Sequence, residues 1–221
     1  ASLCFFLVSN ATAQEIPPPA YQLAAAQAGI PPPVLYAVAL QESGARLHGR
    51  LIPWPWTLNV AGQAQRYATK AEACAGIRRA LARTSASRID AGLGQVNLGF
   101  HAQRYAQPCD LLDPYRNLAV AADILREQHE AGEDWMVAIG RYHRPAGGEP
   151  AARYRHSVRQ HLTRVLGPRT ALGTALNTSR ISSRSKPLSA PCSPSLCSPP
   201  PWRCCPRPPR WPRPTPQRPR R

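Results

Sequence analysis

The chain has 221 residues and a formal net charge of +16, and this charge is concentrated at one end. Residues 169–221 hold ten Arg, one Lys and no acid, so residues 1–168 carry 17 basic and 12 acidic side chains. A strongly basic folded domain is thereby excluded, which makes specific nucleic-acid binding the weakest of the functions considered below.

Residues 1–13 are typical of a truncated secretory signal peptide. A short apolar run precedes Ala11-Thr12-Ala13, which is an A-x-A cleavage site, and the run is too short to span a bilayer. An initiator Met and a basic region before the run are missing. We expect export to the periplasm, a mature chain that begins near Gln14, and no transmembrane anchor in the mature form.

Residues 14–168 are long enough for a single domain with its own core, and we expect most of it to be helical. Capping signals mark several helix starts: Thr69 and Glu72 form a T-x-x-E capping box, and Asp113 and Asp134 precede apolar periodic segments. The predicted helices, in chain order, cover residues 20–27, 34–43, 70–83, 101–105, 114–132, 135–142 and 151–166.

Two segments rich in turn residues interrupt the helices. Residues 52–69 mix Trp, Thr, Val and Tyr with Pro and Gly, which predicts a small β-hairpin or irregular sheet after the second helix. Trp54, Trp56 and Tyr67 in this segment suit stacking on sugar rings and packing in the core equally well. Residues 87–100 contain three glycines and are expected to form a loop.

The cysteines fit an exported protein. Cys4 lies in the signal segment, so Cys74 and Cys109 are the two cysteines of residues 14–168, and an oxidising periplasm favours a disulfide between them. None of the six His has metal-ligand spacing to a Cys or another His, so we expect no metal and no other cofactor.

Residues 169–221 contain 13 of the 26 prolines and four of the seven cysteines, with almost no periodic apolar residues. Such a segment cannot bury enough apolar surface to offset its chain entropy, and we predict that it is disordered. Its composition fits a basic arm that binds an acidic polymer. It fits at least as well the end of a frameshifted gene, because GC-rich DNA read out of frame encodes these residue types.

Glu42, in the segment ALQESG, continues an apolar stripe four residues after Val38 and seven after Leu35. Burial beside these residues and a position at the negative end of a helix both raise the pKa of a carboxyl group. A glutamic acid that stays protonated near neutral pH suits a general acid at a glycosidic oxygen. The alternative is an ordinary Glu at a helix end that reaches into water.

Two later segments carry groups suited to sugar binding. GLGQVN, residues 92–97, presents the Gln95 amide and exposed backbone groups on a glycine-rich turn. AIGRY, residues 138–142, ends in Tyr142, whose phenol is suited to hydrogen-bonding a carboxyl group. The alternatives are a plain glycine turn and a tyrosine of the core.

In this order and spacing, ALQESG, AGLGQVN and AIGRY resemble the E-S, G-L-x-Q and A-x-x-x-Y motifs of the soluble lytic transglycosylase (SLT) domain family, over residues 20–167. PWTLNVAG and LDPYRNLAVAADIL look closest to the small peptidoglycan transglycosylases of conjugation and type IV secretion systems. The resemblance implies a lysozyme-like α+β fold, mainly α, with glycan strands of peptidoglycan as substrate and secretion or conjugation components as partners.

The resemblance also implies a mechanism. Glu42 would protonate the oxygen that links N-acetylmuramic acid to N-acetylglucosamine, while the substrate's acetamido carbonyl stabilises the anomeric carbon. The Glu42 carboxylate would then take the proton of the C6 hydroxyl, and a 1,6-anhydro ring would close without water. Ser43 would orient Glu42, and Tyr142 would hydrogen-bond it. Gln95 and Asn97 would support the sugar.

The chain departs from the family pattern at Gly94, where Met is common, and at His143, where Asn usually follows the motif Tyr. We count His143 among the supporting residues. The second carboxylate of ordinary glycosidases has no obvious candidate, because Asp113 is explained as a helix cap and Asp90 is merely the nearest acid. This absence favours a transglycosylase over a hydrolytic muramidase. A non-catalytic protein that binds glycan or docks secretion subunits is the third hypothesis.

Overall fold

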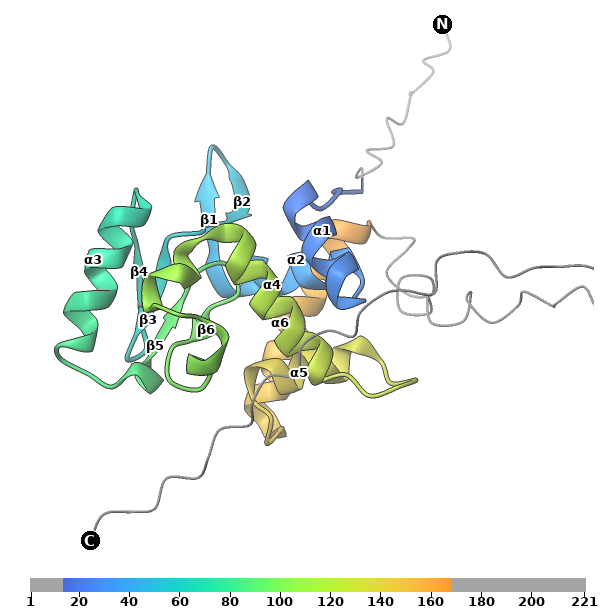
Figure 1. Cartoon of the computed structure of the whole chain (residues 1–221). Helices are drawn as coiled ribbons and strands as arrows, with labels where there is room; N and C mark the ends of the chain where they lie inside the picture. Colours follow the sequence, from blue (N-terminus) through green and yellow to red (C-terminus); the bar gives the residue numbers. More distant parts are fainter. Residues whose placement is uncertain (1–13, 168–221) are drawn as a thin grey trace, which may run out of the picture. The chain divides into compact units, whose positions relative to one another are not determined.

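The computed structural model describes residues 14–167, and the predicted signal segment (1–13) and tail (169–221) lie outside this range. Within it the chain forms six α-helices and two small sheets, so the prediction of a mainly α fold with a minor β part is confirmed (Figure 1). The helices are α1 (Pro19–Ala28), α2 (Pro32–Ser43), α3 (Lys70–Leu81), α4 (Pro114–Glu127), α5 (Trp135–His143) and α6 (Gly148–Leu166).

The strands form a two-stranded sheet, β1-β2, and a four-stranded antiparallel sheet in the order β4-β3-β5-β6. Their bounds are β1 (Gly44–Leu47), β2 (Arg50–Pro53), β3 (Thr57–Val60), β4 (Gln63–Arg66), β5 (Ile89–Ala91) and β6 (Val96–Asn97). The prediction of one small hairpin was therefore too limited, and the prediction of a loop over residues 87–100 was wrong. Strands of two and three residues are too short to show a period-2 pattern.

Helix α2 is the centre of the core. Its residues 34–40 are each at most 2 % exposed, and it packs against α1, α6 and α4. A helix that is apolar on all sides is buried on all sides, and the end of α2 at Ser43 brings Glu42 to the margin of this core. Within residues 14–167 no single helix is long and apolar enough to cross a membrane; α1 and α2 pass that test jointly, with a bend of 116° between them.

Most helix starts agree with the capping signals. Thr69 and Glu72 form the predicted capping box, and the Asp113 and Asp134 side chains accept backbone hydrogen bonds from the first turns of α4 and α5. Helix α4 ends at Glu127, five residues earlier than predicted, because His129 stacks on Trp135 and bonds the Glu133 carbonyl in a turn. The expected helix over residues 101–105 is a 3₁₀ turn, η2 (Ala102–Arg104), and α6 begins three residues earlier than predicted.

The predicted disulfide between Cys74 and Cys109 is confirmed, with Cα atoms 5.3 Å apart. It joins α3 to the 3₁₀ segment η3 (Pro108–Leu112), which leads directly into α4. Figure 1 shows α3 and the four-stranded sheet on one side of α4, and α1, α2 and α6 on the other. The cross-link therefore fastens the sheet-bearing side of the domain to the helix that borders both sides.

Replacing both cysteines by Ala is expected to lower the free energy of unfolding by about 3–4 kcal/mol. The reason is that the disulfide closes a loop between residues 35 apart in sequence and so lowers the entropy of the unfolded chain. Urea unfolding with and without reductant measures this loss. Reductant should bring the wild-type chain to the stability of Cys74→Ala/Cys109→Ala and leave the variant unchanged. Equal unfolding midpoints for oxidised wild type and variant would contradict the prediction.

Candidate active site

The side chain of Glu42 lies half-buried on the last turn of α2, and one hydroxyl holds it in place. The phenol of Tyr154, on α6, donates a hydrogen bond of 2.5 Å to Oε1 of Glu42. Tyr154 is buried with 7 % of its surface exposed, and it was missed in the sequence because no motif surrounds it and 112 residues separate it from Glu42. The predicted apolar surroundings of Glu42 are thus completed by a helix from the far end of the domain.

The surroundings of Glu42 favour its protonated form. Its pKa is raised from the ordinary value of 4.5 to about 7, chiefly by loss of hydration and also by the negative charge of Asp90, against the lowering effect of the Tyr154 hydrogen bond. The raised pKa that the sequence predicted therefore has two causes in the structure, burial and a second acid. Glu42 therefore keeps a proton to donate at higher pH than an ordinary glutamic acid does.

The Gly92–Gln95 turn faces the end of α2 and is fixed by three side chains from three different helices. Ser43 donates from Oγ to the Leu93 carbonyl (2.8 Å), and Tyr142 donates to the Gly94 carbonyl (2.6 Å). Oδ1 of Asn117 accepts from the Gly94 amide at 2.8 Å, while Nδ2 of Asn117 donates to two further carbonyls. The polar atoms of all three side chains are therefore paired at this junction.

The same contacts correct two predicted roles. The Ser43 hydroxyl is fully buried and bonds the carbonyls of Ala39 and Leu93, so it fastens the turn instead of orienting the Glu42 carboxyl. Tyr142 bonds Gly94 and not Glu42, although the charge of Glu42 helps to raise the Tyr142 pKa, as does its burial. The acid is held by Tyr154 instead.

Gly94 and Gln95 show why the turn has this sequence. A Cβ at Gly94 would lie 2.5 Å from Cβ of Ala121 and 3.0 Å from the Tyr142 hydroxyl, so the Met common in the SLT family has no room here. Gln95 adopts a positive φ of 46°, and its Nε2 donates to the Gly92 (2.8 Å) and Thr57 (3.1 Å) carbonyls. The amide nitrogen predicted to hold a sugar is thus engaged in closing the turn.

Asp90, in β5, was named from the sequence only as the nearest acid, and in the structure its charge acts on Glu42. Its own pKa is raised by burial, against the lowering effects of an Asn97 hydrogen bond and of His143. Nδ2 of Asn97 donates to Oδ1 of Asp90 at 2.8 Å, and Asn97 Oδ1 accepts from the backbone of the next turn. Asn97 therefore positions an acid, a role that was not predicted for it.

His143 lies beside the same group of side chains. Its ring stacks on Tyr154, with ring centroids 4.5 Å apart and planes inclined by 2°. Burial lowers the His143 pKa, as does Arg144, while Asp90 raises it. The stacked imidazole restrains the plane of the phenol that holds Glu42, so His143, although exposed, supports the acid indirectly through Tyr154.

The aromatic segment before β3 takes part in packing. Trp54 donates from Nε1 to the Tyr67 carbonyl (2.8 Å), and Trp56 and Tyr67 pack against the core. Asn59 lies directly opposite Asp90 in the β3–β5 register, and its buried Oδ1 has no hydrogen-bond partner within residues 14–167. This unpaired acceptor next to an acid is a second feature that sequence patterns did not indicate.

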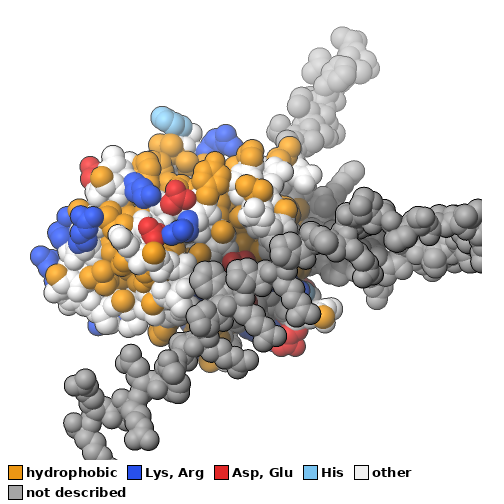
Figure 2. Space-filling view, viewed as in Figure 1, with side chains coloured by type: hydrophobic (Ala, Val, Ile, Leu, Met, Phe, Trp, Pro, Cys, Tyr) orange, Lys and Arg blue, Asp and Glu red, His pale blue; other side chains and the backbone are white. Residues whose placement is uncertain are grey.

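Other classes of site find no support in residues 14–167. No group of three or more His, Cys, Asp or Glu is arranged there to hold a metal ion. On the face shown in Figure 2, basic and acidic side chains are interspersed among apolar and neutral ones and do not form one basic surface. Comparison of the chain with protein-family models, curated proteins and solved structures gives no match.

Glu42→Gln is expected to stabilise the chain in alkaline buffer. The folded-state pKa of about 7 exceeds the ordinary value of 4.5, so wild-type Glu42 destabilises the fold as pH rises between these values. Gln accepts the Tyr154 hydrogen bond without a charge. Above about pH 8 the variant should exceed wild type by roughly 3 kcal/mol, and below about pH 4 the difference should vanish. Urea unfolding across this range tests it; a difference independent of pH would refute the raised pKa.

Asn117→Ala is expected to lower the free energy of unfolding by about 3 kcal/mol, because it removes one hydrogen bond to the Gly94 amide and two to buried carbonyls. Hydrogen exchange of the Gly94 amide should accelerate more than exchange in α2. Tyr115→Ala, on the exposed side of α4, is the matched control and should change stability by less than about 0.5 kcal/mol. A loss for Asn117→Ala no larger than that of the control would show that the turn is held by other contacts.

Proposed function

We propose that residues 14–167 form a peptidoglycan lytic transglycosylase domain with a lysozyme-like fold. The reaction is cleavage of the β-1,4 bond between N-acetylmuramic acid and N-acetylglucosamine, with formation of a 1,6-anhydro end. The proposal rests on the SLT-like motifs together with one observation, the half-buried carboxyl of Glu42 with a pKa of about 7. A surface Glu at a helix end, which was the alternative, would have neither the burial nor the single buried partner.

The Glu42 carboxyl meets the requirements of both steps. A pKa near neutrality leaves a proton available for the glycosidic oxygen, and the same value makes the resulting carboxylate able to accept the proton of the C6 hydroxyl. The Tyr154 hydroxyl occupies Oε1, so Oε2 is the oxygen left to exchange protons with the substrate. Burial also raises the Tyr154 pKa, so the phenol stays neutral and keeps donating throughout.

The Gly92–Gln95 turn would line the substrate side of the acid. Its backbone is fixed by Ser43, Asn117 and Tyr142, and Gln95 is the one residue of the turn that is not buried, so the Gln95 side chain is held in place for hydrogen bonds to hydroxyl and acetamido groups. Nε2 of Gln95 is engaged within the turn, and Oε1 remains as an acceptor for a sugar N–H or O–H.

Asp90 supports a second candidate, a hydrolytic muramidase. Asp90 acts electrostatically on Glu42, and a second carboxylate in a glycosidase stabilises an oxocarbenium-like transition state or activates water. The two reactions begin with the same proton transfer from Glu42 and differ in the group that attacks the anomeric carbon. The sequence favoured the transglycosylase because it offered no clear second carboxylate, and that argument no longer separates the two reactions. The motifs still favour the transglycosylase.

The cellular role is also part of the proposal. Export through the predicted signal would bring the domain to the periplasm, where peptidoglycan lies. The resemblance to transglycosylases of conjugation and type IV secretion suggests local opening of the wall for an envelope-spanning complex, with components of that complex as partners.

Digestion of purified sacculi by the full chain, followed by mass spectrometry of the released muropeptides, tests the proposed reaction. We expect products that end in 1,6-anhydro-N-acetylmuramic acid, and we expect Glu42→Gln to lower the rate by about a thousandfold or more. The wild-type rate should fall as pH rises through about 7, because the proton donor is lost. Reducing ends in place of anhydro ends would establish the muramidase.

Asp90→Asn separates the two candidates in the same assay. For a transglycosylase the variant should retain most of its activity, and removal of the Asp90 charge should shift the alkaline limb of the pH profile to lower pH. For a muramidase the rate should fall by about a hundredfold or more. If sacculi remain intact with folded wild-type protein and are nevertheless bound, the non-catalytic glycan-binding hypothesis replaces both.

A further inference from the structure

A second polar hollow lies away from the Glu42 carboxyl, between the β1-β2 hairpin and the last turns of α6. It has a volume of about 420 Å³, and the side chains that matter for its chemistry are Glu15, Arg46, Arg50, His161 and Arg164. None of them bonds Glu42, Asp90 or the Gly92–Gln95 turn, so the proposed reaction makes no use of them.

The charges of this hollow do not balance. Glu15 is its one acid, and it is shared by Arg164 (3.2 Å) and Arg50 (3.9 Å) while it also accepts from the Tyr36 phenol. Arg46 has no ion pair within residues 14–167 and is exposed. Three guanidinium groups thus face one carboxylate, which leaves an excess of two positive charges before His161 is counted.

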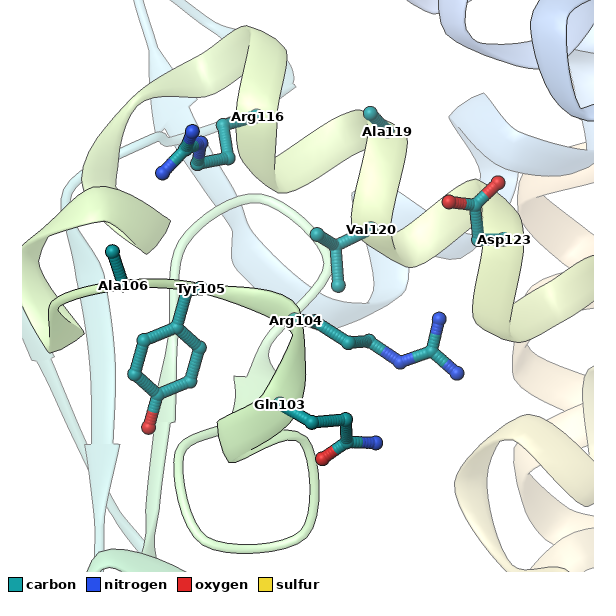
Figure 3. A pocket seen from close by; sticks show the side chains of 8 residues that line it. All are labelled: Gln103, Arg104, Tyr105, Ala106, Arg116, Ala119, Val120 and Asp123. Carbon is teal, nitrogen blue, oxygen red and sulfur yellow. The ribbon is translucent and has the colours of Figure 1, made fainter. Parts of the chain in front are cut away.

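A larger hollow beside α4 provides a contrast (Figure 3). It has a volume of about 590 Å³ and is lined by Arg104, Arg116 and Asp123, among others. Arg104 is paired with Glu127 and Arg116 with Asp110 (2.8 Å), so its arginines are already neutralised. The hollow at α6 is therefore the better site for an anion, because its guanidinium groups keep unused donors.

Helix α6 relates this hollow to the proposed active site. Tyr154, which bonds Glu42, and His161, which lines the hollow, are seven residues apart and therefore lie on the same face of α6, about 10 Å apart along its axis. The hairpin that forms the other wall begins at Gly44, two residues after Glu42. A short extended peptide of three or four residues spans about 10–14 Å, which is comparable to the separation of Tyr154 and His161 along α6.

We propose that this hollow binds the carboxylate groups of the peptide that peptidoglycan carries on its N-acetylmuramic acid, and that it selects glycan bearing such peptides. The inference rests on the proposed function for the identity of the ligand. Arg46 and Arg50 supply forked donors that match carboxylates, and Arg164 is fixed between Glu15 and the Leu51 carbonyl as the inner wall.

Binding of a soluble stem tripeptide with free carboxylates, measured by calorimetry on the full chain, tests the site without any cleavage. Arg46→Gln/Arg50→Gln should weaken binding by roughly tenfold or more. Arg78→Gln/Arg79→Gln is the matched control, since it removes two exposed arginines of α3 that have no ion pair within residues 14–167, and it should bind like wild type. Residues 169–221 are the same in all three proteins, so their charge cancels from the comparison.

Equal binding by both double variants would overturn the proposal. Inorganic phosphate in a parallel titration distinguishes a general anion site: if phosphate binds as tightly as the tripeptide and displaces it, the hollow takes phosphate-bearing ligands instead, and the assignment to stem peptides is wrong.

Cleavage assays connect the site to selection. Arg46→Gln/Arg50→Gln should digest intact sacculi several-fold more slowly than wild type and should digest glycan strands freed of peptides at the wild-type rate. Equal rates on both substrates would contradict selection. If wild type cleaves neither substrate, the proposed function fails while tripeptide binding still decides whether the hollow is a carboxylate site, so the two failures are distinguishable.

Discussion

The site depends on two adjacent polar residues, Glu42 and Ser43, at the end of the buried helix α2. Ser43 is fully buried and needs a partner, which the Leu93 carbonyl provides, so the Gly92–Gln95 turn is drawn to the end of α2. Glu42, one residue earlier, has a single hydroxyl partner, Tyr154 of α6. An unpaired buried polar group costs about 1–3 kcal/mol, so these two bonds fix how the turn and α6 pack against α2.

The side chains around Glu42 divide into those that hold the backbone and those that set charge. Ser43, Asn117 and Tyr142 use their polar atoms on the turn, and none is free to bind a ligand with the same atoms. Tyr154 and Asp90 act on the carboxyl itself, one by a hydrogen bond and the other through its charge. Loss of the first group would affect geometry and stability, whereas loss of the second would change the protonation of Glu42.

Local sequence signals were enough to predict most helices, whereas the features that the sequence did not predict depend on contacts between distant residues. Helix α2, the caps at Thr69 and Asp113 and the Cys74–Cys109 disulfide follow from neighbours in sequence or from a simple count of cysteines. Strand β5 could not be predicted, because it exists through pairing with β3, some thirty residues earlier. The boundary error in α4 has the same origin, since a His129–Trp135 stack overrides local helix propensity.

The same distinction applies to the site: the sequence indicated its residues but not their hydrogen-bond partners. From the apolar pattern and the family resemblance, the sequence predicted that Glu42 is an acid with a raised pKa and that the Gly92–Gln95 turn belongs to the same site. It could not predict which tyrosine holds the acid, because Tyr142 and Tyr154 are both buried beside it and packing alone decides which hydroxyl reaches the carboxyl.

Glu42 and Asp90 have different surroundings, and this difference decides which of the two carboxyls keeps its proton to higher pH. Both are raised in pKa by burial, but Asp90 receives an Asn97 amide and the influence of His143, whereas Glu42 receives one phenol and the charge of Asp90. Of two carboxyls, the one whose anion is less stabilised keeps its proton to higher pH. Glu42 is therefore the acid of the pair and Asp90 the anion. For either of the proposed reactions the assignment would be the same, because it is set by the surroundings of the two groups and not by the identity of the nucleophile.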